Sequence, residues 1–171
     1  DQLQASGAAV IIARCDTSEA SHVRRLVAAA PHAPRGVWHA AGVLADALLP
    51  KQTAASIARV YAPKAQGATA LQLTMGSLPL QACTLFSSVS ALLGGAGQAN
   101  YSASNACLDA LASWRRGHGH AAVSVQWGAW AELGMAARGA ASERMAAMEA
   151  ASGITRVRVA QGLSALHTAV Y

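Results

Sequence analysis

The sequence is poor in the residues that build disulfide, metal and membrane structures. It has three cysteines in 171 residues, Cys15, Cys83 and Cys107, which form no CxxC or mixed Cys/His cluster. This odd, dispersed set argues against a disulfide framework or a metal centre and indicates a reducing, cytoplasmic setting. Apolar runs are interrupted well before the roughly 18 residues that a membrane span needs, and no signal peptide opens the chain. We therefore expect a soluble protein that does not contact membranes.

Charge is scarce as well. Charged residues make up 12% of the chain, and the net charge of +5 comes from scattered cations without interleaved aromatics. This pattern does not predict a nucleic-acid partner. Hydrophobic residues, by contrast, make up 53% of the chain, which is enough for the core of one ordinary domain.

A third absence concerns dinucleotide binding. No GxGxxG turn is present, because Gly94-Gly95-Ala96-Gly97 has the wrong spacing and does not directly follow a strand-like run. The turn that would receive a pyrophosphate at a helix N-terminus is therefore lacking. Since the sequence also opens on Asp1 and runs almost at once into an apolar segment, we expect it to be part of a longer polypeptide.

Strand-like and helix-like segments alternate along the chain. Short apolar runs predict strands at 8–13, 36–42, 80–87 and 122–127. Helical patterns cover 20–30, 53–77, 97–117, 142–151 and 159–170. Asp16 or Thr17 is expected to cap the first helix, and Pro63 to divide or kink the second. Such an alternation predicts an α/β fold with a parallel sheet covered by helices.

Polar residues gather where the predicted strands end, which is where such sheets bind ligands. Ser88 follows the third strand, and Tyr101 lies at or near the start of the next helix, with Asn105 one turn further on the same face. A tyrosine, whose pKa is near 10, needs a nearby cation or hydrogen bonds that stabilise its phenolate before it can do acid/base work at neutral pH. Of the two lysines, Lys51 and Lys64, the second lies in a small-residue neighbourhood that allows close packing. A serine that orients a carbonyl and a tyrosine that protonates it would suit carbonyl reduction.

Four segments resemble one known family. They are HAAGVLAD (39–46), YAPKAQGA (61–68), FSSVSALLGGAGQANYSASNACLDALASWRR (86–116) and WGAWAELGM (127–135). Together they are similar to the catalytic half of a ketoreductase domain of a type I polyketide synthase, a relative of the short-chain dehydrogenases/reductases. The resemblance implies a Rossmann-like, doubly wound parallel sheet. Residues 1–171 would be a partial ketoreductase domain, without the first strand-helix units and the last strand.

The resemblance also implies the catalytic roles. Tyr101 would be the proton donor, Ser88 the hydroxyl that orients the carbonyl, Lys64 the cation that lowers the pKa of the tyrosine, and Asn105 the fourth member. Simple reductases of the superfamily carry lysine four residues after the tyrosine, whereas this chain has asparagine there. That difference favours the ketoreductase subfamily and a lysine on the preceding helix.

The implied cofactor is NADPH, and the implied substrate is a β-ketoacyl chain on the phosphopantetheine arm of an acyl carrier protein. The partners would be that carrier and other domains of the same synthase. The resemblance places Lys64 and Tyr101 at the cofactor together with Asp16 near the adenine, His39, Ala40, Ala41 and Gly42 along the ribose, and Trp127 and Gly128 near the nicotinamide. Because the glycine turn is absent, we expect residues 1–171 alone to bind NADPH poorly and to have little activity.

Three residues bear on stereochemistry through the resemblance. Asp46 lies in a Leu-x-Asp loop, Leu93 replaces the tryptophan that marks the opposite facial preference, and Met135 lies in a lid expected at about 128–155. Together they favour the B-type product, the D-alcohol. Two alternatives stay open: the ketoreductase of a multifunctional fatty acid synthase, and a catalytically silent structural domain, which the intact Lys64 and Tyr101 argue against.

Overall fold

The fold is organised around a three-stranded parallel sheet with the strand order β1-β2-β3. The computed structural model describes residues 5–132, 146, 149–150, 153 and 155–170. The strands are β1 (Gly36–His39), β2 (Ala82–Ser88) and β3 (Val123–Trp127). Registers Gly36↔Ala82 and Ser88↔Trp127 align the strands in parallel. The predicted parallel α/β sheet is confirmed, with three strands in the described part of the chain.

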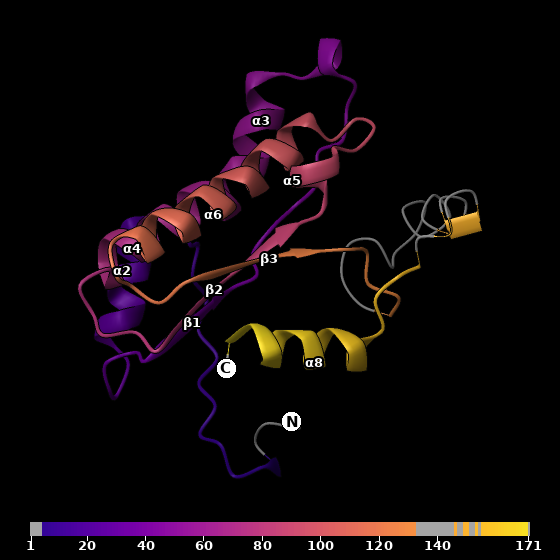
Figure 1. Cartoon of the computed structure of the whole chain (residues 1–171). Coiled ribbons are helices and arrows are strands. Elements are labelled where there is room, and N and C mark those ends of the chain that lie inside the picture. Colours follow the sequence, from indigo (N-terminus) through magenta and orange to yellow (C-terminus); the bar gives the residue numbers. More distant parts are fainter. Residues whose placement is uncertain (1–4, 133–145, 147–148, 151–152, 154, 171) are drawn as a thin grey trace.

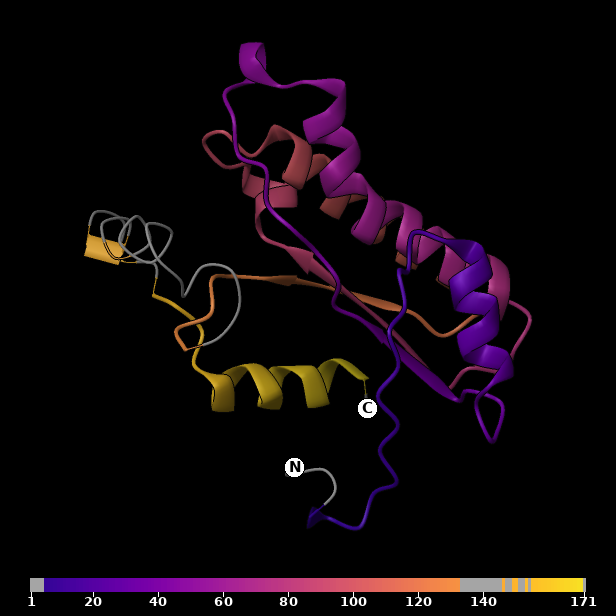
Figure 2. The same cartoon turned by 180° about the vertical axis from the view of Figure 1, so that it is seen from behind.

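Helices cover both faces of this sheet (Figures 1 and 2). On one face lie α2 (Ala20–Ala28), α3 (Ala54–Tyr61), α4 (Gly67–Met75) and α6 (Ala99–Gly117), and on the other lies α8 (Val159–Val170). Shorter helical pieces are the 3₁₀ turn η1 (Leu49–Lys51), the π-helix η2 (Ala62–Gln66) and α5 (Ser90–Leu93). Coverage on both faces matches the doubly wound arrangement, and the sheet is only part of such a fold.

The core lies between the sheet and helices α4 and α6. Cys83 and Leu85 point from β2 toward this side, where they meet Ala68 and Met75 of α4 and Leu108 of α6. The central strand is buried by neighbours on both sides, which explains its continuous apolar run.

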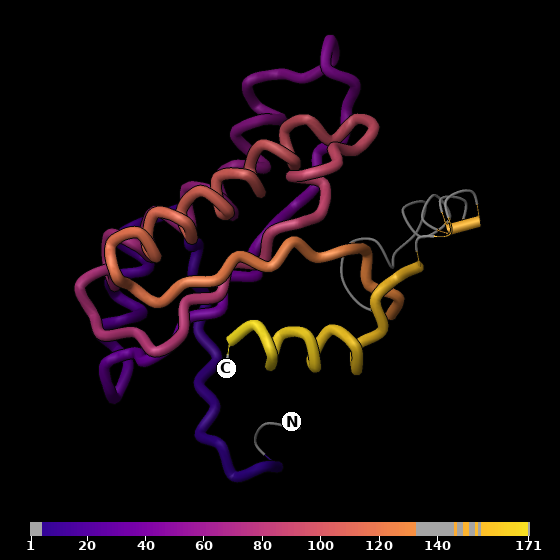
Figure 3. Tube along the Cα trace, viewed as in Figure 1, coloured from indigo at the N-terminus to yellow at the C-terminus, as the bar shows by residue number. Residues whose placement is uncertain are grey.

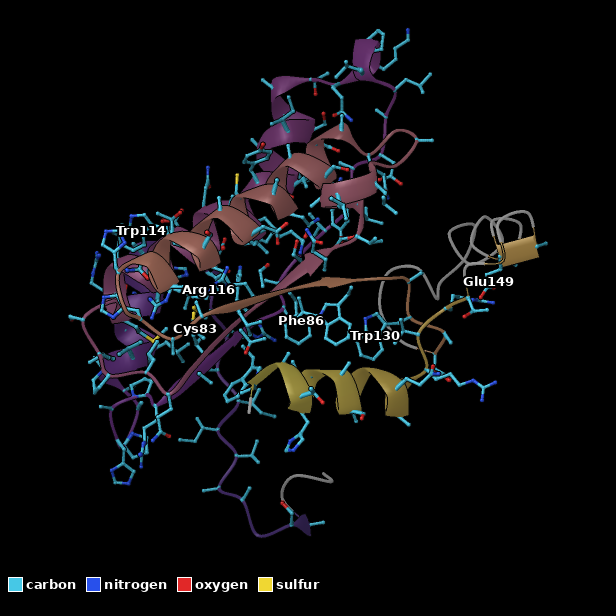
Figure 4. The ribbon with its side chains drawn as sticks, viewed as in Figure 1. Cys83, Phe86, Trp114, Arg116, Trp130 and Glu149 are labelled. Carbon is cyan, nitrogen blue, oxygen red and sulfur yellow. The ribbon has the colours of Figure 1, made fainter. Side chains whose placement is uncertain are left out.

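The opposite face of the sheet carries an aromatic row. Phe86 and Trp127 have ring centroids 5.6 Å apart, and Trp127 and Trp130 have centroids 4.9 Å apart. Figure 4 shows Phe86 and Trp130 on the side of α8. Gly162 of α8 lies so close to the Trp130 ring that an added Cβ would come within 2.1 Å of it. Glycine is therefore required at this contact.

Two predictions near the amino terminus are wrong. Residues 8–13 form no strand, and Ile11 and Ile12 are 73% and 92% exposed. An apolar run becomes a strand only where a neighbouring backbone pairs with it, and Figure 3 shows this indigo segment running away from the sheet. Asp16 does not cap α2, because the helix begins after Glu19, and Asp16 instead accepts hydrogen bonds from the amide and hydroxyl of Ser18. Thr17 does not cap it either.

The helical region after β1 contains two α-helices, α3 and α4, on either side of Pro63, as one of the two predicted forms has it. A capping box between Thr53 and Ser56 starts α3, and the helical path continues through the π-helix η2 into α4. Pro63 thus lies between two α-helices, and the π-helical link that contains it was not predicted. The helix predicted at 142–151 falls largely outside the described residues.

Where the structure describes the chain, no helix has the length and apolarity to cross a membrane. Those same residues include no group of three or more metal-ligating side chains.

Candidate active site

The candidate site lies at the carboxyl end of β2, where the strand ends at Ser88. The Ser88 Oγ accepts a hydrogen bond from the Ser90 amide at 3.2 Å, so the first turn of α5 anchors this side chain. Ser87, on the other side of the strand, is buried and donates to the carbonyl of Asn105 at 3.3 Å. The paired serines therefore point to opposite sides, and Ser88 is the one that faces Tyr101.

Tyr101 lies in the first turn of α6 and is held there by Asn100. The Asn100 Oδ1 accepts the Tyr101 amide at 2.8 Å, and its Nδ2 donates to the carbonyl of Ala45 at 2.9 Å. Asn100 is 4% exposed, so these bonds are shielded from water. The loop before the helix turns at Gly97, whose φ is +74°. The Gly97 carbonyl accepts a hydrogen bond from the Ala47 amide at 2.9 Å. These contacts fix Tyr101 against the loop that follows β1.

Burial raises the pKa of the Tyr101 phenol above its ordinary value. The side chains of Asn105 and Ser88 lie near enough to lower this pKa, and the Asp46 carboxylate raises it. Burial dominates because it penalises the charged phenolate. The phenol therefore carries its proton at neutral pH. The expectation that Lys64 lowers the pKa of Tyr101 is wrong for this structure, because burial of the phenol outweighs the groups that lower the pKa, and Lys64 is not among them.

Lys64 extends from the π-helix η2 to the same place. It is 3% exposed, its Nζ donates to the carbonyl of Phe86 at 2.8 Å, and the Nζ lies 5.4 Å from the centroid of the Tyr101 ring. Burial lowers the pKa of Lys64 to about 8, against a smaller opposing effect of the Asp109 carboxylate. A Cβ at Gly42 would come within 2.9 Å of the Lys64 Cε, so the glycine leaves room for the lysine stem.

Asn105 completes the group of four. Its Nδ2 donates to the Tyr101 carbonyl at 2.8 Å, while its buried Oδ1 has no partner among the described residues. The structure thus brings together the four predicted side chains, Lys64, Ser88, Tyr101 and Asn105, from three elements at the carboxyl end of β2. Asn105 is hydrogen-bonded to the backbone of Tyr101. Among the described residues, no hydrogen bond joins Asn105 to Lys64.

The residues predicted along the cofactor are spread around the ends of the strands. His39 ends β1 and is 3% exposed, with Ala40, Ala41 and Gly42 directly after it. Trp127 ends β3, is 8% exposed, and has a buried Nε1 without a partner in the described structure, with Gly128 next to it. Asp16 is exposed beside Ser18 and His22 and contacts none of the four.

The residues predicted for stereocontrol lie on the two loops that meet beside Tyr101. Asp46 accepts a hydrogen bond from the Gln98 amide group at 3.5 Å, which joins the loop after β1 to the loop before α6. Leu93 ends α5 and is 69% exposed. Met135 and most of the predicted lid lie outside the described residues.

Sequence reasoning missed two residues that shape the site and one contact of a predicted residue. They are Asn100, which clips the helix start; Asp109, whose carboxylate acts on Lys64 and accepts from Ser124 and Gln126 of β3; and the hydrogen bond of the His39 ring. For Asn100 the only signal was its place directly before the tyrosine, in a stretch that also holds Gln98 and Ser102. The ring of His39 bonds to a residue 25 positions away, which no local pattern could predict.

Comparison with known proteins identifies one family. The sequence model of the family described as "KR domain" matches residues 1–132. The polyketide synthase GfsB of Streptomyces halstedii is 50% identical over 147 residues, which is 85% of this chain and 3% of that synthase. The phthioceranic/hydroxyphthioceranic acid synthase of Mycobacterium tuberculosis is 37% identical over 179 aligned positions, covering the whole of this chain and 8% of that enzyme.

Solved structures agree with the sequence comparison. An A-type ketoreductase from a modular polyketide synthase superposes with a TM-score of 0.92 at 34% identity. The match covers 99% of this chain and 35% of the ketoreductase chain. The chain therefore spans about a third of that relative, and only a few per cent of each whole synthase.

Proposed function

Because the chain belongs to the KR domain family, the ketoreductases of polyketide synthases within the short-chain dehydrogenase/reductase superfamily, we propose that its site uses NADPH to reduce the β-keto group of an acyl chain. The observation that carries this proposal is the convergence of Lys64, Ser88 and Tyr101. Lys64 and Tyr101 lie 5.4 Å apart, from nitrogen to ring centroid, and Ser88 lies near the phenol. An oriented hydroxyl, a protonated phenol and a buried cation are the groups that carbonyl reduction needs.

The proton needed by the product comes from Tyr101. Its phenol donates to the ketone oxygen as negative charge develops there, and the Lys64 ammonium stabilises the phenolate that remains. The Ser88 oxygen already accepts a hydrogen bond from the Ser90 amide. Its own O–H, which lies beside the Tyr101 phenol, would turn to the ketone oxygen. Asn105 holds the Tyr101 carbonyl, so the helix turn that carries the phenol keeps its position.

NADPH, when bound, supplies the hydride. One observation supports the fit of such a cofactor: the buried Nε1 of Trp127, at the end of β3, has no hydrogen-bond partner among the described residues. A buried donor without a partner is expected to meet a ligand or water. The residues that would hold the cofactor are Asp16, the backbone of His39, Ala40, Ala41 and Gly42, Trp127, Gly128, Lys64 and Tyr101.

The proposed substrate is a β-ketoacyl group on the phosphopantetheine arm of an acyl carrier protein, within a synthase whose other domains are further partners. This follows from the relatives, which are large synthases. The B-type, D-configured product is proposed from the resemblance of Asp46 and Leu93 to the family pattern. Gln98 holds Asp46 against the loop before Tyr101. Met135 is the third residue proposed for this selectivity. A fatty acid synthase ketoreductase is the second candidate, and the intact group of four side chains argues against a silent structural domain.

The test is NADPH oxidation with a β-ketoacyl thioester by the whole polypeptide, including any sequence on either side of residues 1–171. We expect Tyr101→Phe to lower kcat by about 10²- to 10⁴-fold, the usual contribution of a positioned acid. The matched control is Tyr61→Phe, which removes a half-buried hydroxyl at the end of α3 and should leave the rate unchanged. An unaltered rate in Tyr101→Phe would remove the central assignment.

A further inference from the structure

The π-helix that carries Lys64 places a backbone carbonyl where another element can reach it. In η2 the amide of Gly67 donates to the carbonyls of Ala62 and Lys64, so the turn is wider than an α-helical one. Pro63 has no amide to donate, which removes one of the bonds that would hold a regular helix. Backbone bonding therefore specifies this turn less firmly than the helices on either side.

The ring of His39 supplies the missing restraint from the end of β1. Its Nε2 lies 3.1 Å from the carbonyl oxygen of Lys64, and the residue is 3% exposed. A carbonyl only accepts, so Nε2 carries the proton in this contact. Burial lowers the pKa of His39, and the Lys64 ammonium acts in the same direction, so the ring is neutral at neutral pH.

Close packing fixes the orientation of this ring. A Cβ at Gly67 would lie 3.1 Å from the His39 Cε1 and 2.7 Å from the Thr17 Oγ1. The ring is thus enclosed between the start of α4 and the segment before α2. At 3% exposure the ring is shielded from solvent.

We propose that His39 is a positioning residue for the reduction, whose Nε2–H holds the Lys64 carbonyl and so fixes the turn that directs the Lys64 ammonium to Tyr101. The proposal rests on the proposed function and adds a role for the ring beyond lining the cofactor. Lys64 is then held at two points, its carbonyl by β1 and its Nζ by the Phe86 carbonyl of β2. Both strands belong to the same sheet, so these two hydrogen bonds fix the position of Lys64 relative to the sheet.

The ionisable groups around this contact come from several elements. Lys64 of η2 contacts His39 of β1 and the Tyr101 ring of α6. The Asp109 carboxylate of α6 acts electrostatically on the Lys64 ammonium. The Asp46 carboxylate acts on Tyr101 from the loop after β1. A variant that releases Lys64 should therefore change the pH profile of the reaction as well as its rate.

Two amide variants separate the hydrogen bond from mere packing. In His39→Gln the side-chain nitrogen reaches the position of Nε2, whereas in His39→Asn it stops one bond short. In the whole polypeptide we expect His39→Asn to lower kcat by about 10- to 100-fold, as misplacement of a catalytic group does, with a smaller effect on the Kd for NADPH, because the variant keeps the backbone of residue 39. His39→Gln should recover most of this loss. The control is His118→Asn, since His118 also contacts a helix carbonyl, that of Trp114, but at the exposed far end of α6.

A second measurement follows Lys64 directly and needs no substrate. The Lys64 signal in a ¹³C-lysine NMR spectrum is identified by its loss in Lys64→Arg, and its pKa is then titrated. We expect the value of about 8 to rise toward that of a solvated lysine in His39→Asn and to stay in place in His39→Gln. In the unaltered protein, NMR of the His39 ring should show the neutral Nε2–H tautomer, whether or not either variant folds.

Several results would overturn the proposal. They are an Nδ1–H tautomer or an imidazolium at His39, an unchanged Lys64 pKa in His39→Asn, equal losses of kcat in both amide variants, or a weaker Kd for NADPH with kcat unaltered. Failure of the unaltered protein to reduce any β-ketoacyl thioester would refute the proposed function instead. The NMR comparison would still decide whether His39 places Lys64.

Discussion

Replacing Lys64 by methionine should stabilise the fold while it abolishes reduction. The side chain is 3% exposed and its pKa is lowered from 10.5 to about 8, so folding disfavours its charged form. At about 1.36 kcal/mol per pKa unit, this shift corresponds to about 3 kcal/mol of destabilisation at neutral pH. Methionine fills the space of the lysine stem but loses the bond to the Phe86 carbonyl, worth about 1 kcal/mol. The expected net gain is about 2 kcal/mol.

The stability gained in Lys64→Met should fall as the pH rises. Below about pH 8 lysine is charged in both states and the full penalty is present, whereas between about 8 and 10.5 the native state loses its proton first. The unaltered domain therefore becomes more stable relative to the variant as the pH rises through this window, and the advantage of methionine should nearly vanish by about pH 10.

Urea unfolding of a complete ketoreductase domain carrying this chain, followed at about pH 7 and pH 10, measures the effect. The matched control is Lys51→Met, because Lys51 is exposed on η1 and its replacement should change little. A Lys64→Met domain that is less stable at pH 7, or whose gain is the same at both pH values, would refute the reasoning.

The remaining predictions concern the reaction itself. The kcat/KM of the unaltered protein should fall as the pH rises above about 8, where Lys64 loses its charge; a profile that stays flat to pH 10 would contradict the role of the ammonium. Asp109→Asn removes the carboxylate that raises the pKa of Lys64, so the same fall should begin at lower pH, and a shift to higher pH would count against it. Chiral chromatography of the product should give the D-alcohol, and the L-alcohol would overturn the interpretation of Asp46 and Leu93.

A large part of the fold could be predicted from local pattern. The strands at β1, β2 and β3 and the helices α2, α6 and α8 fall where apolar runs and helical periodicity placed them, because each buries a regular stripe of side chains. Residues 8–13 show the limit of this method. Their run is as apolar as that of β2, yet Ile12 is 92% exposed, since strand formation depends on a pairing partner that sequence pattern does not supply.

The candidate site could be predicted only as a set of residue types. Serine at the end of a strand, tyrosine at the start of a helix and a single suitable lysine follow from position and chemistry. Their helpers do not: Asn100 bonds to Ala45 across 55 positions, and the ring of His39 bonds to the carbonyl of Lys64 across 25. These contacts depend on which loops the folded sheet brings together.

By itself the sequence determined the α/β class, the family resemblance and the four side chains at the centre of the site, because these depend on residue identity and spacing along one chain. Only the tertiary structure decided how Lys64 reaches Tyr101. Its position depends on a widened helical turn, a histidine from the end of β1 and a carbonyl of β2. Burial then sets its pKa, and burial is a property of the packed molecule that no single segment carries.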